Sequence, residues 1–128
     1  MIILDTMVII KSILRWLPAV SIMVAIFGFS SLPSPEVPSF GLWDPVVEKG
    51  AHIMGYGLLA LAFWYALRFD KRRKWLVLLL AVLYAITDEF HQSFVSGRHS
   101  SWVDVFIFDG SGASLMLLGV SWIRKRMR

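Results

Sequence analysis

A chain of 128 residues is short enough to form one domain, and its 57% hydrophobic and 17% charged content is too apolar for a soluble domain of that size. The mean hydropathy of +0.66 indicates an integral membrane protein. A net charge of +4 would suit a nucleic-acid binder, but the cations gather at the ends of apolar segments, so we expect no nucleic-acid partner. Cysteine is absent, which excludes disulfides and thiolate metal sites.

The first predicted span covers roughly residues 16–35, because no charged residue occurs there and about 20 apolar residues cross a bilayer core. A run rich in serine and proline at residues 30–35 marks its exit. Residues 1–14 form either an interfacial segment or the start of this span. Lys11 and Arg15 ahead of the apolar core also fit a cleaved signal peptide, which is the alternative interpretation.

The second predicted span covers roughly residues 48–67. The Asp-Pro pair at 44–45 indicates a helix start, with a capping carboxylate followed by proline in the first turn. Lys49, His52 and Tyr56 follow at i, i+3 and i+7 and therefore share one helix face. The span is expected to end in a short basic turn.

The third predicted span covers roughly residues 75–94 and carries acidic groups into the membrane. Only uncharged residues separate Lys74 from Asp88, and at 1.5 Å per residue they cover about 20 Å of a core about 30 Å thick. The helix must therefore continue through Asp88, Glu89 and Gln92, which places these groups in the outer third of the bilayer. Ionisable groups at that depth are costly and usually functional.

Polar side chains of the second and fourth spans are predicted to lie at the same depth. Measured from Arg68 at 1.5 Å per residue, Tyr56 lies about 18 Å deep, His52 about 24 Å and Lys49 about 28 Å. Measured from the basic end of the fourth span, Asp109 lies about 22 Å deep and Asp104 about 30 Å. Three helices thus deliver polar groups to one layer, which predicts a single site.

We predict an all-α polytopic membrane protein, a bundle of four transmembrane helices in one domain of residues 1–128, with the fourth span at roughly 105–123. With both termini in the cytoplasm, only Lys49 and Arg98 among the 13 Lys and Arg residues lie outside. The polar layer then opens to the extracytoplasmic face of a bacterial cytoplasmic (inner) membrane.

Two motifs resemble those of the VanZ-like family of bacterial integral membrane proteins. The first reads Glu48-Lys49-Gly-Ala-His52-Ile-Met-Gly-Tyr56-Gly57, and the second reads Asp88-Glu89-Phe-His91-Gln92-Ser-Phe94-Val-Ser-Gly97-Arg98, followed by Asp104. The resemblance covers roughly Leu17 to Val120. It implies the membrane architecture, the positions of the site residues and a link to low-level resistance to the glycopeptide antibiotic teicoplanin.

The chain departs from the family pattern in the fourth span. The family places an Asn or Asp four residues after the first aspartate, but here that position is Phe108 and Asp109 comes one residue later. Five residues turn a regular helix by about 500°, so Asp104 and Asp109 cannot both face inward from it. Either a π-bulge absorbs the extra residue or Asp104 lies ahead of the helix proper.

Structural roles are alternatives for several of these residues. Ser101 and Asp104 fit the capping-box pattern at a helix start, in which case Asp104 only caps the helix. Lys49 and one of Asp88 or Glu89 are alternatively an interhelical ion pair that holds the bundle together.

The histidines have comparable alternatives. His52 is either a site residue or a buried, hydrogen-bonded histidine, while His91 and His99 are expected to be interfacial residues. A metal held by His52, Asp88 and Glu89 is geometrically possible. The presence of carboxylates and a histidine is by itself weak evidence for a metal site, so we predict no metal and no cofactor.

Three functions remain open. The polar layer either recognises the headgroup of a membrane lipid or a lipid-linked envelope precursor, catalyses a reaction on such a lipid, or couples proton or ion movement to transport. The candidate catalytic residues are Asp88, Glu89 and His52, with Arg98 stabilising negative charge. The predicted ligand-binding residues are Lys49, His52, Tyr56, Asp88, Glu89, Gln92, Arg98 and Asp104.

Overall fold

The computed structural model describes residues 2–127, and within that range it contains helices and no strands. The α-helices are α1 (Ile2–Leu14), α2 (Leu17–Ser30), α3 (Asp44–Ala66), α4 (Lys74–Gln92), α5 (Trp102–Asp104) and α6 (Gly110–Arg126). A π-helix, η4 (Val105–Asp109), joins α5 to α6, and the 3-10 turns are η1 (Ser34–Glu36), η2 (Gly41–Trp43) and η3 (Lys71–Arg73). The all-α class predicted from composition is confirmed.

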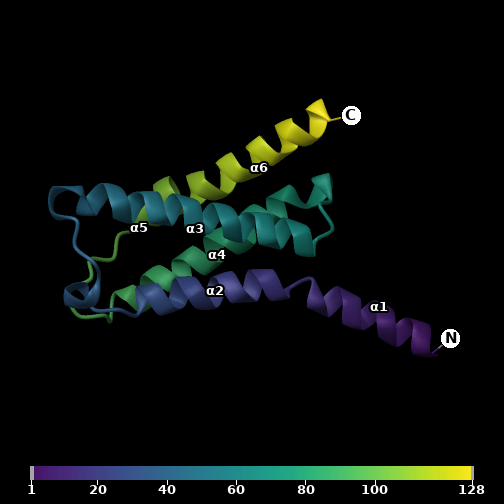
Figure 1. Ribbon diagram of the computed structural model, residues 1–128, viewed down its shortest axis with the longest axis horizontal. Helices are drawn as coiled ribbons and strands as arrows, with labels where there is room; N and C mark the ends of the chain where they lie inside the picture. The colour runs from purple at the N-terminus through teal and green to yellow at the C-terminus, as the bar shows by residue number, and fades with distance from the viewer. Residues whose placement is uncertain (1, 128) are drawn as a thin grey trace.

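The helices lie lengthwise beside one another, so the bundle has two distinct ends (Figure 1). One end, here called the basic end, holds the α3–α4 turn, the C-terminal end of α6 and the start of α2, from which α1 projects beyond the bundle. The other, here called the polar end, holds the loop between α2 and α3 and the loop between α4 and α5. Both termini therefore lie toward the same end.

The first apolar helix differs from the predicted span of 16–35. It ends at Ser30, because prolines 33 and 35 follow and neither has a backbone N–H to continue it. The helical stretch that is long and apolar enough for a membrane is Thr6–Ser30, which includes most of α1. The ring of Pro18 conflicts with the carbonyl of Leu14, which accounts for the break between α1 and α2.

Within residues 2–127, three helical stretches are long and apolar enough to cross a membrane: Thr6–Ser30, Lys71–Gln92 and Trp102–Arg126. The third and fourth predicted spans are thus confirmed as apolar helices, with α4 continuing through Asp88 and Glu89 as the depth argument requires. The predicted second span corresponds to α3, whose start at Asp44 is confirmed. The predicted capping role of Asp44 is wrong, because its carboxylate accepts from Ser39 and Phe40 ahead of the helix and makes no capping bond. Charged residues in its first turns lower its apolar content, and it is not one of the three stretches.

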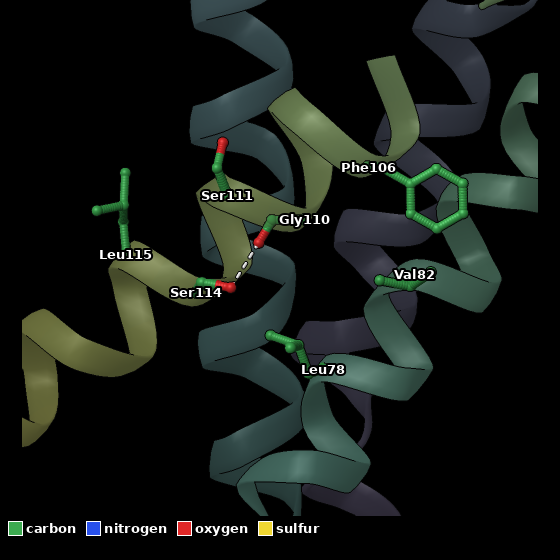
Figure 2. Close-up of a pocket in the computed structure, with 7 residues that line it drawn as sticks. All are labelled: Leu78, Val82, Phe106, Gly110, Ser111, Ser114 and Leu115. Carbon is green, nitrogen blue, oxygen red and sulfur yellow. Dashed lines mark hydrogen bonds between the residues drawn. The ribbon is translucent and has the colours of Figure 1, made fainter. Parts of the chain in front are cut away.

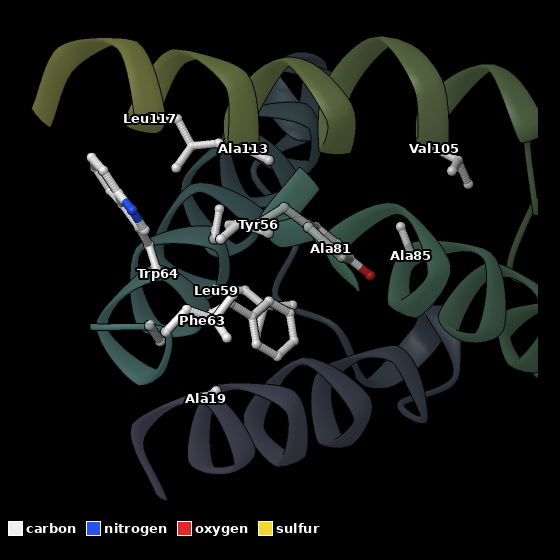
Figure 3. Close-up of a cluster of buried hydrophobic side chains, with 14 residues drawn as sticks. Ala19, Tyr56, Leu59, Phe63, Trp64, Ala81, Ala85, Val105, Ala113 and Leu117 are labelled. Carbon is white, nitrogen blue, oxygen red and sulfur yellow. The ribbon is translucent and has the colours of Figure 1, made fainter. Parts of the chain in front are cut away.

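Helix α3 is the centre of the bundle, in contact with α2, α4 and α6. Its buried residues, among them Tyr56, Leu59 and Trp64, form the core with Ala81 of α4 and Leu117 of α6 (Figure 3). Most of the buried residues on the facing helices are small, so the backbones approach closely, as is usual where membrane helices pack.

The closest approach is between α3 and α6. A Cβ atom on Gly112 would lie 2.2 Å from the backbone oxygen of Ile53, and one on Gly57 would lie 3.2 Å from the oxygen of Gly112. These two glycines therefore set the distance and register between α3, which carries three of the polar side chains described below, and α6, which continues from η4.

Candidate functional site

The polar side chains predicted to share one face of α3 each meet a different carboxylate. Lys49 Nζ donates to Asp104 Oδ2, and His52 Nδ1 lies 2.8 Å from Asp109 Oδ1. One further turn along, the Tyr56 hydroxyl donates to Asp88 Oδ2 at 3.2 Å. Each pair joins residues that were predicted to lie in the same layer of the membrane. These six residues, together with Glu89, are here called the polar layer. The predicted pairing of Lys49 with Asp88 or Glu89 is wrong, because Asp104 is its partner.

The π-helix η4 explains how Asp104 and Asp109 both face α3. The backbone N–H of Gly110 donates to the oxygen of Val105, five residues earlier, so this turn is one residue wider than an α-turn. Residues five apart then lie on nearly the same face. Of the two predicted explanations, the bulge that absorbs an extra residue is therefore confirmed, and Asp109, whose place was open from sequence, lies in the polar layer.

Only one of the two carboxylate oxygens of Asp88 accepts hydrogen bonds from the described residues. Its Oδ2 accepts from Ser30 Oγ at 2.8 Å and from Gln92 Nε2 at 3.2 Å, in addition to Tyr56. Its Oδ1 is buried and accepts no hydrogen bond from any residue in the described range. The carboxyl group is 97% buried with an unused acceptor, which is costly unless another donor reaches it.

Glu89 connects the third helix to the start of the fourth. Its Oε1 accepts the backbone N–H of Ser101, and the residue is buried. The capping box predicted for Ser101 and Asp104 is wrong, because the Ser101 side chain makes no capping bond and Asp104 is bound to Lys49. The backbone N–H of Ser101 is instead accepted by Glu89, which lies on α4.

The loops at the polar end fix Arg98 to helix α2. Its Nη2 donates to the Phe29 oxygen at 2.9 Å and its Nε to the Leu32 oxygen at 3.1 Å, while Nη1 is 3.9 Å from Glu48. Gly97 beside it has a φ of +73° and accepts from Ser34 Oγ at 2.6 Å. Arg98 therefore satisfies carbonyls at the end of α2, a helix that has no C-terminal glycine to do so.

His91 and His99 lie apart from the polar layer. The His91 ring stacks on Phe27 with centroids 4.3 Å apart, and its Nε2 is 3.0 Å from Ser31 Oγ. His99 is exposed in the loop that follows α4. Both are therefore peripheral, as expected. Among the described residues, no group of three His, Asp or Glu side chains is arranged to hold a metal ion.

Accessibility varies through the polar layer. The side chains of Lys49 and Asp104 are 30% and 14% exposed, whereas those of His52 and Asp109 are 16% and 2% exposed. The Lys49–Asp104 pair is therefore the more accessible part of the polar layer, and the His52–Asp109 pair the more buried part.

An open groove of about 500 Å³ lies between α4 and α6, away from the polar layer (Figure 2). Its walls include Leu78, Val82 and Phe106, and its serines are satisfied within their own helix: Ser111 Oγ donates to the Phe108 oxygen and Ser114 Oγ to the Gly110 oxygen. The groove is thus effectively apolar and offers no group for catalysis.

A helical bundle with three stretches suited to a bilayer and a charged layer at one end defines a polytopic membrane protein. The profile of the family described as VanZ/LLP1 matches residues 3–124. Because that match covers nearly the whole sequence, the chain belongs to the VanZ/LLP1 family, and the resemblance seen in the two motifs is confirmed. Comparison with curated proteins and with solved structures finds no match.

Ser30 is a member of the site that sequence reasoning missed. It was interpreted only as part of the exit from the first span, yet it donates to Asp88 and accepts from Gln92 Nε2 at 3.2 Å. The sequence does not separate it from the neighbouring serines of the same run, because the need for a partner arises from its burial, which only the packing shows.

Proposed function

We propose that this protein is a four-span membrane protein with both termini in the cytoplasm, and that its polar layer recognises the headgroup of an envelope lipid or lipid-linked precursor on the extracytoplasmic side. The observation that carries the proposal is the excess of buried carboxylates over cations in the layer. Asp88, Glu89 and Asp109 are each at least 97% buried, and Lys49, the lysine nearest them, is bound to Asp104.

This excess favours a ligand that donates hydrogen bonds. Arg98 and Lys49 already have oxygen partners, so they have little capacity left for an anion. Asp88 Oδ1 is an unused acceptor, and Glu89 uses one oxygen on Ser101. A headgroup with hydroxyl or ammonium groups would supply the missing donors, and charge-assisted bonds of this kind are strong. The family's link to glycopeptide resistance fits a ligand from the envelope.

The length and position of α3 support the proposal that it is a fourth span. Its 23 residues extend about 35 Å, enough to cross a core of about 30 Å. Its charged first turns, in which Glu48 is exposed, would lie at the membrane surface on the side of the polar end. With α3 as a fourth span, both termini fall on the side that holds most of the Lys and Arg residues.

Ligand recognition is tested by native mass spectrometry of the protein extracted gently with its lipids. We expect a co-purified lipid that carries hydroxyl or amine donors, and we expect Asp104→Asn and Glu89→Gln to lose it. Glu36→Gln is the matched control, since Glu36 is an exposed carboxylate in η1 outside the polar layer. Retention of the same lipids by all three variants would contradict the proposal.

Orientation is tested by cysteine labelling in intact cells. Cysteines at Ser39 and Ser100 in the loops of the polar end should react with an impermeant thiol reagent, and one at Phe69 in the α3–α4 turn should not. Labelling at Phe69 alone would reverse the orientation and place the site on the cytoplasmic side.

A further inference from the structure

His52 is held by a carboxylate that is itself almost completely buried. Its Nδ1 lies 2.8 Å from Asp109 Oδ1, and the Asp109 side chain is 2% exposed. An ionised carboxylate only accepts hydrogen bonds, so this contact places a proton on Nδ1. The ring is further oriented by Tyr56, which stacks on it with centroids 6.2 Å apart and an angle of 21°.

The other ring nitrogen is left free. His52 Nε2 has no hydrogen-bond partner among the described residues, and it is not one of the buried, unpartnered atoms, so it is open to a ligand. A histidine with Nδ1 fixed by a buried carboxylate and Nε2 presented outward is the arrangement that serves proton transfer in many enzymes.

The surroundings of the pair are acidic. Glu48 on α3 and Glu89 on α4 both lie close enough to interact electrostatically with His52. Asp88 and Asp104 interact in the same way with Asp109, and Lys49 one turn away is bound to Asp104. Burial disfavours an imidazolium at His52, and these carboxylates oppose that effect by stabilising its charge.

We propose that His52 and Asp109 form a proton-transfer pair acting on a hydroxyl or protonated amine of the bound headgroup, an inference that rests on the headgroup function proposed above. The O–H or N–H bond of the ligand breaks, its electron pair stays on the oxygen or nitrogen, and the proton passes to His52 Nε2. The proton later returns to the ligand or to water. Asp109 is a positioning residue that acts through His52, and η4 is the device that turns Asp109 toward the ring.

The proton-transfer pair can be tested through the tautomer of His52, without knowing which reaction the protein catalyses. In protein with His91→Gln and His99→Gln, His52 is the remaining histidine, and ¹⁵N NMR of labelled histidine reports which nitrogen carries the proton. We expect the proton on Nδ1 and a free electron pair on Nε2. In Asp109→Asn the carboxamide can donate to Nδ1, which favours the opposite tautomer and should slow modification of His52 by diethyl pyrocarbonate at least tenfold.

Asp44→Asn is the matched control, because Asp44 is an aspartate outside the polar layer whose carboxylate accepts from Ser39 Oγ and the Phe40 N–H and does not contact His52. It should leave the tautomer and the modification rate unchanged. A proton on Nε2 in the unaltered protein, or equal spectra for Asp109→Asn and the parent, would overturn the proton-transfer pair.

The ligand class is tested with lipid nanodiscs. We expect the Nε2 resonance to differ between discs made of total bacterial lipid extract and discs of phosphatidylcholine alone, whose headgroup has no N–H or O–H donor. Identical spectra would overturn proton transfer to the headgroup. If a lipid co-purifies but His52 carries its proton on Nε2, only the proton-transfer pair is contradicted. If no lipid co-purifies and the spectra in the two kinds of nanodisc are identical, the proposed headgroup function is contradicted as well.

Discussion

The two ends of the bundle hold their cations in different ways. At the polar end, Lys49 is bound to the carboxylate of Asp104. At the basic end, Arg124 lies over the rings of Trp64 at 5.8 Å and Phe69 at 5.0 Å, and Lys74 lies over Trp64 at 5.2 Å. Lys49 also lies over the Phe108 ring at 5.0 Å, and at the basic end Arg73 lies 3.4 Å from Asp70. The two ends differ in that Lys49 has a carboxylate partner, whereas Arg124 and Lys74 have aromatic faces and no ion pair in the described structure.

The difference determines the charge that each end presents. An aromatic face attracts a cation without neutralising it, so the basic end remains positive. At the polar end, ion pairing consumes the cation and leaves carboxylates in excess. The same bundle thus separates a region of net positive charge from a region in which buried carboxylates outnumber cations.

Gly112→Ala should disturb both ends at once, because Gly112 fixes the contact between α3 and α6. The new methyl group would meet the backbone oxygen of Ile53 at 2.2 Å, and a backbone atom cannot rotate away. We expect a loss of about 3 kcal/mol in unfolding free energy, measured by thermal unfolding in detergent. Gly119→Ala on the same helix has no atom within 4 Å of the new group and should not destabilise the protein. Equal behaviour of the two variants would contradict the close approach.

Replacing Lys49 should have the next largest effect and applies to the polar end alone. Lys49→Met leaves Asp104 without its cation, at a cost of about 2 kcal/mol because the pair is partly exposed. The double variant Lys49→Met with Asp104→Leu should recover most of that loss, since no unpaired charge remains. Additive losses in the double-mutant cycle would show that the two residues do not form a pair.

Arg124→Gln tests the basic end and should have the smallest effect. It removes the cation from the faces of Trp64 and Phe69, and we expect about 1 kcal/mol of destabilisation. Lys125→Gln is the control, because Lys125 is exposed and lies over no aromatic ring in the described structure. If both variants unfold at the same temperature, the aromatic contacts of Arg124 contribute nothing measurable.

The fold was largely predictable from hydropathy and charge. Helix α3 begins at the predicted Asp44, and α4 continues through Asp88 because a shorter helix would not cross a bilayer. The first span was placed too late, since proline positions rather than apolar content determine where α2 begins and ends. A hydropathy pattern does not show which helix lies at the centre of a bundle. The central position of α3 is therefore seen only in its contacts with the other helices.

The site was predictable as a layer but not as a set of contacts. Helix rise placed Lys49, His52 and Asp104 at one depth, and they do lie together. The choice of partner depends on helix rotation and tilt, which sequence spacing leaves undetermined, so Lys49 was assigned to the wrong acids. Arg98 was expected to face a ligand, whereas the carbonyls at the end of α2 already bind it.

The wide turn of η4 also has a consequence for the register of α6. One extra residue in a regular helix rotates everything after it by about 100°, which would carry Ala113 and Leu117 out of the core. Because η4 takes up the residue locally, the rest of α6 keeps its register against α3. A one-residue difference in length between Asp104 and Asp109 can thus be absorbed without rebuilding the rest of the bundle.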